Sequence, residues 1–101
     1  MPALHITKDN FQETVLNSSK PTLLDFWAPW CGPCRAVVPL VEEIAGERSD
    51  IQVGKINVDE EQDLARQFRI MSIPTLMVIK DGKVVNKAIG ARSKQQILSM
   101  L

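Results

Sequence analysis

Apolar positions along the chain follow two periods, one typical of strands and one typical of helices. Residues 22–28 read Thr-Leu-Leu-Asp-Phe-Trp-Ala, and such a nearly continuous run of large apolar side chains is typical of a strand buried on both faces. We therefore expect this strand at the centre of a sheet. Residues 51–58 predict a second strand, and Leu4–Ile6 is expected to begin the sheet as an edge strand.

Four segments carry the helical period or its boundary signals. Asp9 with Gln12 and Ser93 with Gln96 each match the capping pattern that precedes a helix. Pro39 lies inside the second segment, where it removes a backbone donor and is expected to kink the helix. The predicted helices cover residues 9–17, 33–46, 60–68 and 93–101.

A β-hairpin is predicted in the last third of the chain. Leu76–Ile79 and Val84–Val85 are joined through Asp81-Gly82, a pair that supplies the positive φ angles of a tight turn. Helices that alternate with strands and precede a hairpin predict an α/β fold, with a mixed sheet covered by helices on both faces. No repeat or linker interrupts residues 1–101, so we expect a single domain.

Composition and charge argue against several classes of protein. The 101 residues are 45% apolar, which suffices for one packed core. Lys plus Arg and Asp plus Glu number 12 each, so no long-range field would gather nucleic acid or an anionic membrane. The first residues lack the pattern of a signal peptide, and no apolar run approaches the roughly 18 residues of a membrane span. We expect a cytoplasmic protein.

The two cysteines, Cys31 and Cys34, are the first candidates for chemistry. A disulfide between such close neighbours closes a short loop and adds little stability. Pro33 is favoured in a first helical turn, which places Cys31 at the helix N-terminus, where the dipole and the free N–H groups favour a thiolate. A thiolate is the attacking species in disulfide exchange, and Cys34, one turn later, is expected to be the resolving thiol.

A zinc half-site is the alternative interpretation of this pair. Structural zinc is nearly always held by four ligands, yet the chain has no further cysteine, and its one histidine, His5, is far away in sequence. We therefore expect no metal.

Asp25 interrupts the apolar run of the strand that is expected to be buried. Burial of a carboxyl group raises its pKa, which suits a group that exchanges protons near neutral pH. Our hypothesis is that Asp25, directly or through a water, takes the proton from Cys34 as that thiol attacks a mixed disulfide. The alternative is a structural acid, satisfied by hydrogen bonds or by Lys55.

The run 25–34, together with Ile73-Pro74-Thr75, Asp81-Gly82-Lys83 and Gly90, resembles the thioredoxin family across almost the whole chain. The resemblance implies the thioredoxin fold, with a central mixed sheet of about five strands flanked by about four helices. It also implies a protein-disulfide reductase that carries electrons on a Cys31-Cys34 disulfide and uses no separate cofactor.

By position, the resemblance implies a role for each of four residues near the dithiol. Cys31 corresponds to an exposed nucleophile and Cys34 to a buried resolving cysteine. Asp25 corresponds to a buried acid, and Lys55 to a lysine near that acid.

The resemblance also implies a substrate-binding rim around Cys31. Pro74 corresponds to a proline that follows a cis peptide bond, which leaves the Ile73 backbone free to pair with an extended substrate segment. For the Ile73 side chain, packing in the core is the alternative. The residues implied to contact substrate are Trp30, Gly32, Pro33, Ile73, Pro74, Gly90 and Ala91.

Partners are implied in the same way. Gly32-Pro33 stands where disulfide isomerase relatives carry a histidine, which favours reduction of disulfide-containing target proteins. No Gly-rich nucleotide loop is present, so the electrons are implied to come from a flavin-containing, NADPH-dependent thioredoxin reductase, with the chain acting as a monomer. A dedicated donor to one partner and a scaffold subunit are the alternatives. Phe68, Arg69 and Ile79 depart from residues common in the family and leave the choice of partner open.

Overall fold

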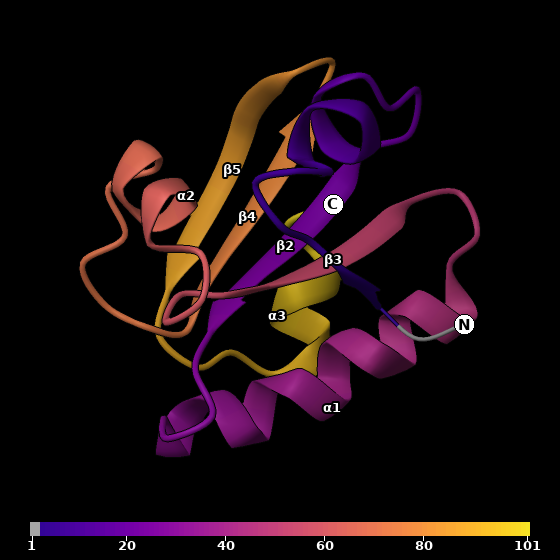
Figure 1. Ribbon diagram of the computed structural model, residues 1–101. Helices are drawn as coiled ribbons and strands as arrows, with labels where there is room; N and C mark the ends of the chain where they lie inside the picture. The colour runs from indigo at the N-terminus through magenta and orange to yellow at the C-terminus, as the bar shows by residue number, and fades with distance from the viewer. Residues whose placement is uncertain (1–2) are drawn as a thin grey trace.

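The apolar run that begins at Thr22 forms the middle strand of a five-stranded sheet in the computed structural model, which describes residues 3–101 (Figure 1). The strands lie in the order β1-β3-β2-β4-β5. In chain order the elements are β1 (Leu4–His5), the short π-helix η1 (Gln12–Leu16), β2 (Thr22–Trp27), α1 (Gly32–Glu47), β3 (Gln52–Asn57), α2 (Gln62–Gln67), β4 (Thr75–Lys80), β5 (Lys83–Ile89) and α3 (Lys94–Leu98).

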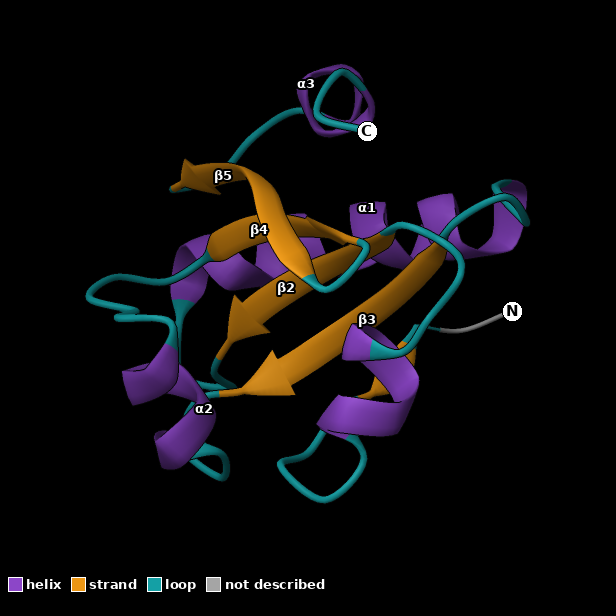
Figure 2. Ribbon diagram, turned by 90° about the horizontal axis from the view of Figure 1, so that it is seen from above, coloured by secondary structure: helices purple, strands orange, loops and turns teal. Residues whose placement is uncertain are grey.

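Alternate side chains of β2 enter two different cores, because successive residues of a strand point to opposite faces. Leu23 packs in the core beneath α1 and α3, which supply Val37, Val41, Ile44 and Ile97. Leu24 and Phe26 pack in the other core, to which η1 and α2 contribute Val15 and Leu64. Helices therefore cover both faces of the sheet (Figure 2). By the same alternation, Asp25 points toward the α1 side.

Strand directions bring the two family motifs together at one end of the sheet. β2 is parallel to β3 and antiparallel to β4, with Phe26 opposite Thr75. The end of β2, which leads into the Cys31 turn, therefore lies beside the start of β4, which follows Pro74. The prediction of a mixed sheet with a central strand at 22–28 is confirmed.

The first predicted helix is shorter than expected, and its predicted cap is wrong. The helical segment begins after Phe11, and no side chain caps it. The local hydrogen bonds come from Asn10 instead: its Oδ1 accepts the N–H of Thr7 and its Nδ2 donates to the carbonyl of His5. These bonds hold the chain in a turn through residues 8–10, so the helix cannot start at Asp9.

The predicted hairpin and the predicted C-terminal cap are confirmed. Asp81 and Gly82 both have positive φ angles, 53° and 77°, as the tight turn requires. Ser93 and Gln96 form a reciprocal capping box at the start of α3. Within residues 3–101, none of the helices has both the length and the apolar composition needed to cross a membrane.

Candidate active site

Cys31 and Cys34 form a disulfide where the turn after β2 leads into α1. Cys31 is the N-cap residue of α1, and its Sγ accepts a hydrogen bond from the backbone N–H of Cys34 at 3.2 Å. Pro33 lies in the first turn of the helix, as predicted. The sulfur of Cys31 thus occupies the position where free N–H groups and the helix dipole stabilise negative charge.

The disulfide is more buried than the resemblance implies. Cys34 is 1% exposed, and Cys31 is 4% exposed rather than open to solvent. The reason is packing in the oxidised state: Ala28, Trp27, Val58 and Ile73 surround the two sulfurs. Cys31 is the more accessible of the pair, and Gly32 and Pro33 beside it are exposed.

The Ile73-Pro74 segment lies directly against the disulfide. The peptide bond between these residues is cis, and the carbonyl oxygen of Ile73 lies 3.7 Å from the Sγ of Cys31. Gly90 is tied to the same place, because its N–H donates to the carbonyl of Pro74 at 2.8 Å. This hydrogen bond holds Gly90 beside the Ile73-Pro74 segment.

The residues of the expected rim differ in their exposure. Trp30 is 66% exposed and Ala91 is also exposed, whereas Ile73 and Gly90 are half-buried. Pro74 is buried, so its ring is not part of the outer surface as expected. It lies immediately before β4, whose residues 75–79 are also buried. Ile73 packs against the core as well as against the cysteines, so its side chain takes part in core packing.

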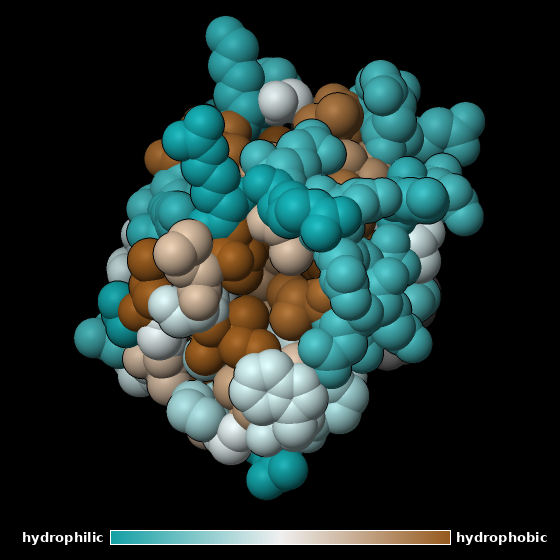
Figure 3. All heavy atoms as spheres, turned by 60° about the vertical axis from the view of Figure 1, so that its left-hand side comes forward, coloured by the Kyte–Doolittle hydropathy of each residue, from teal (hydrophilic) through white to brown (hydrophobic). Residues whose placement is uncertain are grey.

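An apolar hollow of about 190 Å³ opens beside Trp30. Figure 3 shows apolar surface on this side of the molecule, surrounded by hydrophilic side chains. The indole Nε1 of Trp30 donates to Asp59 at 2.9 Å, which fixes the ring over the hollow. Sequence reasoning missed the other residues that line it, Val58, Ala65, Ile70, Met71 and Ser72. The sequence signal that could have pointed to this hollow is Met71, an apolar residue in the polar connection before Ile73-Pro74.

Asp25 is completely buried, and neither carboxylate oxygen has a hydrogen-bond partner within the described part of the chain. Burial raises the pKa of this carboxyl group from 3.8 to about 7, and the positive charge of Lys55 opposes the rise. No hydrogen bond from the described protein residues therefore holds this group in its ionised form. The carboxyl group is instead free to change its protonation state near neutral pH.

Lys55 lies opposite Asp25 in the parallel pairing of β2 and β3, but its ammonium group pairs elsewhere. Its Nζ lies 2.9 Å from Oε2 of Glu42 on α1 and 5.5 Å from the centre of the Trp27 ring. The expected neighbourhood of Lys55 and Asp25 is thus present, whereas a direct ion pair is not. Sequence reasoning missed Glu42, because nothing in a helical pattern marks one of two adjacent glutamates.

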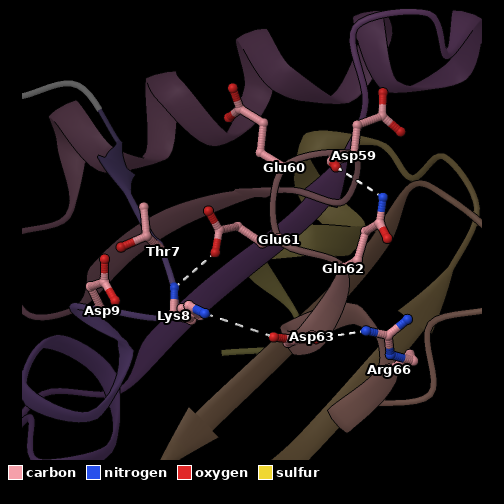
Figure 4. Close-up of a pocket in the computed structure, with 9 residues that line it drawn as sticks. All are labelled: Thr7, Lys8, Asp9, Asp59, Glu60, Glu61, Gln62, Asp63 and Arg66. Atoms are coloured by element: carbon pink, nitrogen blue, oxygen red, sulfur yellow. Dashed lines mark hydrogen bonds and ion pairs between the residues drawn. The ribbon is translucent and has the colours of Figure 1, made fainter.

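A second pocket, of about 360 Å³, lies between the end of β1 and the start of α2 (Figure 4). Its side chains are mostly acidic, and several are paired: Lys8 and Arg66 both contact Asp63, and Glu61 accepts the N–H of Lys8. Among residues 3–101, no group of three or more His, Cys, Asp or Glu side chains is arranged to hold a metal ion. Asp59, which lines this pocket, is also the hydrogen-bond partner of Trp30.

A disulfide that joins the first turn of a helix to its N-cap, set against a mixed sheet with helices on both faces, defines a thiol–disulfide oxidoreductase.

Residues 2–101 match the family model for thioredoxin. The chain is 48% identical over 99 residues to the thioredoxin of Mycobacterium tuberculosis, covering 97% of this chain and 85% of that protein. It is 50% identical over 100 residues to thioredoxin 1 of Synechococcus elongatus, covering 98% and 94%.

The chain belongs to the thioredoxin family. It is a dithiol redox protein that works through its own disulfide, with disulfide-containing targets and a reductase as its general partners. The scaffold interpretation, in which the cysteines have no use, is not favoured.

Proposed function

We propose that this protein is a general protein-disulfide reductase in which Cys31 attacks and Cys34 resolves. The observation that carries the proposal is the environment of the Cys31 sulfur, which accepts the Cys34 N–H at the N-terminus of α1. In addition, residue Cys31 is 4% exposed and residue Cys34 is 1% exposed. Both features favour a thiolate that can reach a target disulfide.

The reaction runs in two exchanges. The Cys31 thiolate attacks one sulfur of a target disulfide; the Cys31–target bond forms, the target disulfide breaks, and one target sulfur leaves as a thiolate that takes up a proton. Cys34 then loses its proton and attacks the Sγ of Cys31, which forms the Cys31–Cys34 disulfide and releases the second target thiolate. The target gains two electrons, and the protein loses two.

We assign the proton of Cys34 to Asp25 in the second exchange. The carboxyl group points to the α1 side, has no hydrogen-bond partner among residues 3–101, and has a pKa of about 7, so its ionised form can accept a proton near neutral pH. Lys55 opposes the rise of that pKa. It therefore lowers the pH above which Asp25 is ionised and can act as a base.

Replacing Asp25 with asparagine is expected to slow the second exchange by about 100-fold, because a positioned general base is lost. In the wild-type protein, the rate of this step should rise with pH through about 7, and the variant should lose that inflection. Rapid-quench measurement of mixed-disulfide decay checks both results. The first exchange, measured in the same experiment, is the internal control and should keep its rate. An unchanged decay rate would exclude the role of Asp25.

The substrate contacts proposed are Trp30, Gly32, Pro33, Ile73, Pro74, Gly90 and Ala91, with the Ile73 backbone pairing an extended target segment. We further propose that residues 1–101 act as one domain, that the protein is a cytoplasmic monomer, and that a flavin-containing, NADPH-dependent thioredoxin reductase returns its electrons. The absence of a Gly-rich nucleotide loop from the chain supports an external electron donor.

Turnover on unrelated substrates tests the general function. Several protein disulfides of different sequence are incubated with the protein and a small dithiol, and release of target thiols is followed. Reduction of all of them above the dithiol background is the expected result. Reduction of one alone would indicate a dedicated donor, and no reduction would contradict the proposal. A variant with both cysteines replaced by serine provides the matched blank.

A further inference from the structure

Asp25 lacks a partner although a cation lies opposite it. The parallel pairing of β2 and β3 places Lys55 at the same level as Asp25 and on the same face of the sheet. Both side chains point to the α1 side, since Lys55 contacts Glu42 of α1. Even so, both Asp25 oxygens lack hydrogen-bond partners in the described chain. A buried carboxylate next to a lysine normally pairs with it, so something must hold the ammonium group away.

Glu42 and Trp27 account for the position of the ammonium group. Lys55 Nζ lies 2.9 Å from Glu42 Oε2 and 5.5 Å from the Trp27 ring centre, within the range of a cation–π contact. The side chains of Lys55 and Glu42 are 21% and 32% exposed. The ion pair therefore lies at the solvent edge of the space above β2, whereas Asp25 is fully buried.

Glu42 is itself held in place. Its Oε1 accepts the backbone N–H of Ala3 at 2.5 Å, which ties α1 to the chain just before β1. Burial raises the pKa of Glu42, but the Ala3 hydrogen bond and Lys55 together outweigh burial and leave that pKa below its ordinary value. Glu42 is therefore ionised at every pH at which Asp25 titrates, and its charge is constant there.

We propose that Glu42 is a positioning residue for the disulfide site: it holds the Lys55 ammonium group at the solvent edge and so leaves the carboxyl group of Asp25 unpaired. The inference deepens the proposed function, because its effect on turnover depends on Asp25 acting as the proton acceptor.

The groups that face Asp25 come from each neighbouring element. β3 contributes Lys55, and α1 contributes, through Lys55, the charge of Glu42. β4 contributes the apolar Leu76 opposite Asp25. Arg35 of α1 donates to the carbonyl of Pro29 and so points back to the turn. Burial is the main influence on the pKa of Asp25, and Lys55 is the charge that opposes it; Glu42 acts on Lys55 through their ion pair.

The test is Glu42→Gln in the oxidised protein, where the cysteines do not titrate. Glutamine keeps an acceptor for the Ala3 N–H but removes the charge that holds Lys55. The pKa of Asp25, followed by carboxyl-carbon NMR, is expected to fall by about one unit, because an opposite charge that comes closer favours the ionised form. No fall would overturn the proposal.

Two further variants separate positioning from a general charge effect. Glu43→Gln removes the adjacent charge, which pairs with Lys94 instead, and should leave the pKa of Asp25 unchanged; an equal fall in this variant would overturn the proposal. In a Lys55→Met background, Glu42→Gln should no longer shift the pKa, because the two residues act as one unit. A full shift in that background would show that Glu42 acts directly and would also overturn it.

The pH profile of mixed-disulfide decay in reduced Glu42→Gln protein provides the functional measurement. It should move to lower pH by the same amount as the Asp25 pKa. If the pKa of Asp25 falls while the pH profile does not move, the positioning role of Glu42 is supported and the catalytic role of Asp25 is contradicted. Failure of the Glu42 proposal can thus be distinguished from failure of the Asp25 proposal.

Discussion

A Cys34→Ser variant is expected to stop after the first exchange and to remain covalently bound to its target through Cys31. The Cys31 sulfur keeps its place at the N-terminus of α1 and can still attack, but the sulfur that would release the target, one turn along the helix, is missing. Net turnover should fall to background. Non-reducing electrophoresis should show a one-to-one adduct, and a small dithiol should release the target by reducing the mixed disulfide.

The reciprocal variant is the control. Cys31→Ser should form no adduct, because Cys34 is only 1% exposed. Equal adduct formation by the two variants would contradict the assignment of attacking and resolving sulfurs. The Cys31 sulfur is also the N-cap acceptor of α1; serine is a favoured N-cap residue, so Cys31→Ser is expected to keep the helix start while it removes the sulfur.

The sequence predicts best those elements whose apolar pattern matches the burial that they have in the fold. Residues 22–28 are apolar on both faces and are covered by helices on both faces, so the pattern identified the central strand. β5 is the opposite case. Its residues are nearly all exposed at the edge of the sheet. After Val84 and Val85 the chain continues with asparagine and lysine, and polar and apolar residues do not alternate. The sequence therefore predicted only the first part of this strand.

The site shows the same division. The position of Cys31 follows from Pro33 and from the strand that precedes it, both of which are local signals. The hollow beside Trp30 and the pairing of Lys55 with Glu42 are not local, because they join β3, α1 and the segment before β4. The burial of Cys31 could not be predicted either, since it depends on how closely Trp27, Val58 and Ile73 pack around the disulfide.

Burial of Asp25 lowers the free energy of unfolding when its carboxyl group is ionised. A carboxyl group with no partner in a packed interior is tolerated only in its neutral form. Evolution toward stability alone would favour an apolar residue at this position of β2, between Leu24 and Phe26. Its presence in the central strand is therefore an argument for a chemical role that can be measured thermodynamically.

Asp25→Asn is expected to remove a pH dependence of stability worth about 4 kcal/mol, the equivalent of a pKa raised from 3.8 to about 7. The folded-state pKa lies above the unfolded-state value, so between these two pH values the unfolded chain gives up a proton that the folded protein keeps. The wild-type free energy of unfolding therefore falls as pH rises through this window and levels off above about 7. The variant has no carboxyl group at this position and lacks the fall.

Denaturant unfolding of the oxidised proteins at pH 4, 6 and 8 measures this difference. Relative to the wild type, the variant should gain about 4 kcal/mol between pH 4 and pH 8, whatever the fixed cost of burying an amide. Asp50→Asn is the matched control: Asp50 is exposed, and its hydrogen bond with Arg48 lowers its pKa to about 2, so its contribution is lost only below the window. A constant difference between wild type and Asp25→Asn would mean that Asp25 is ionised in the folded protein, and a base with an ordinary pKa would be too weak to take a proton from Cys34.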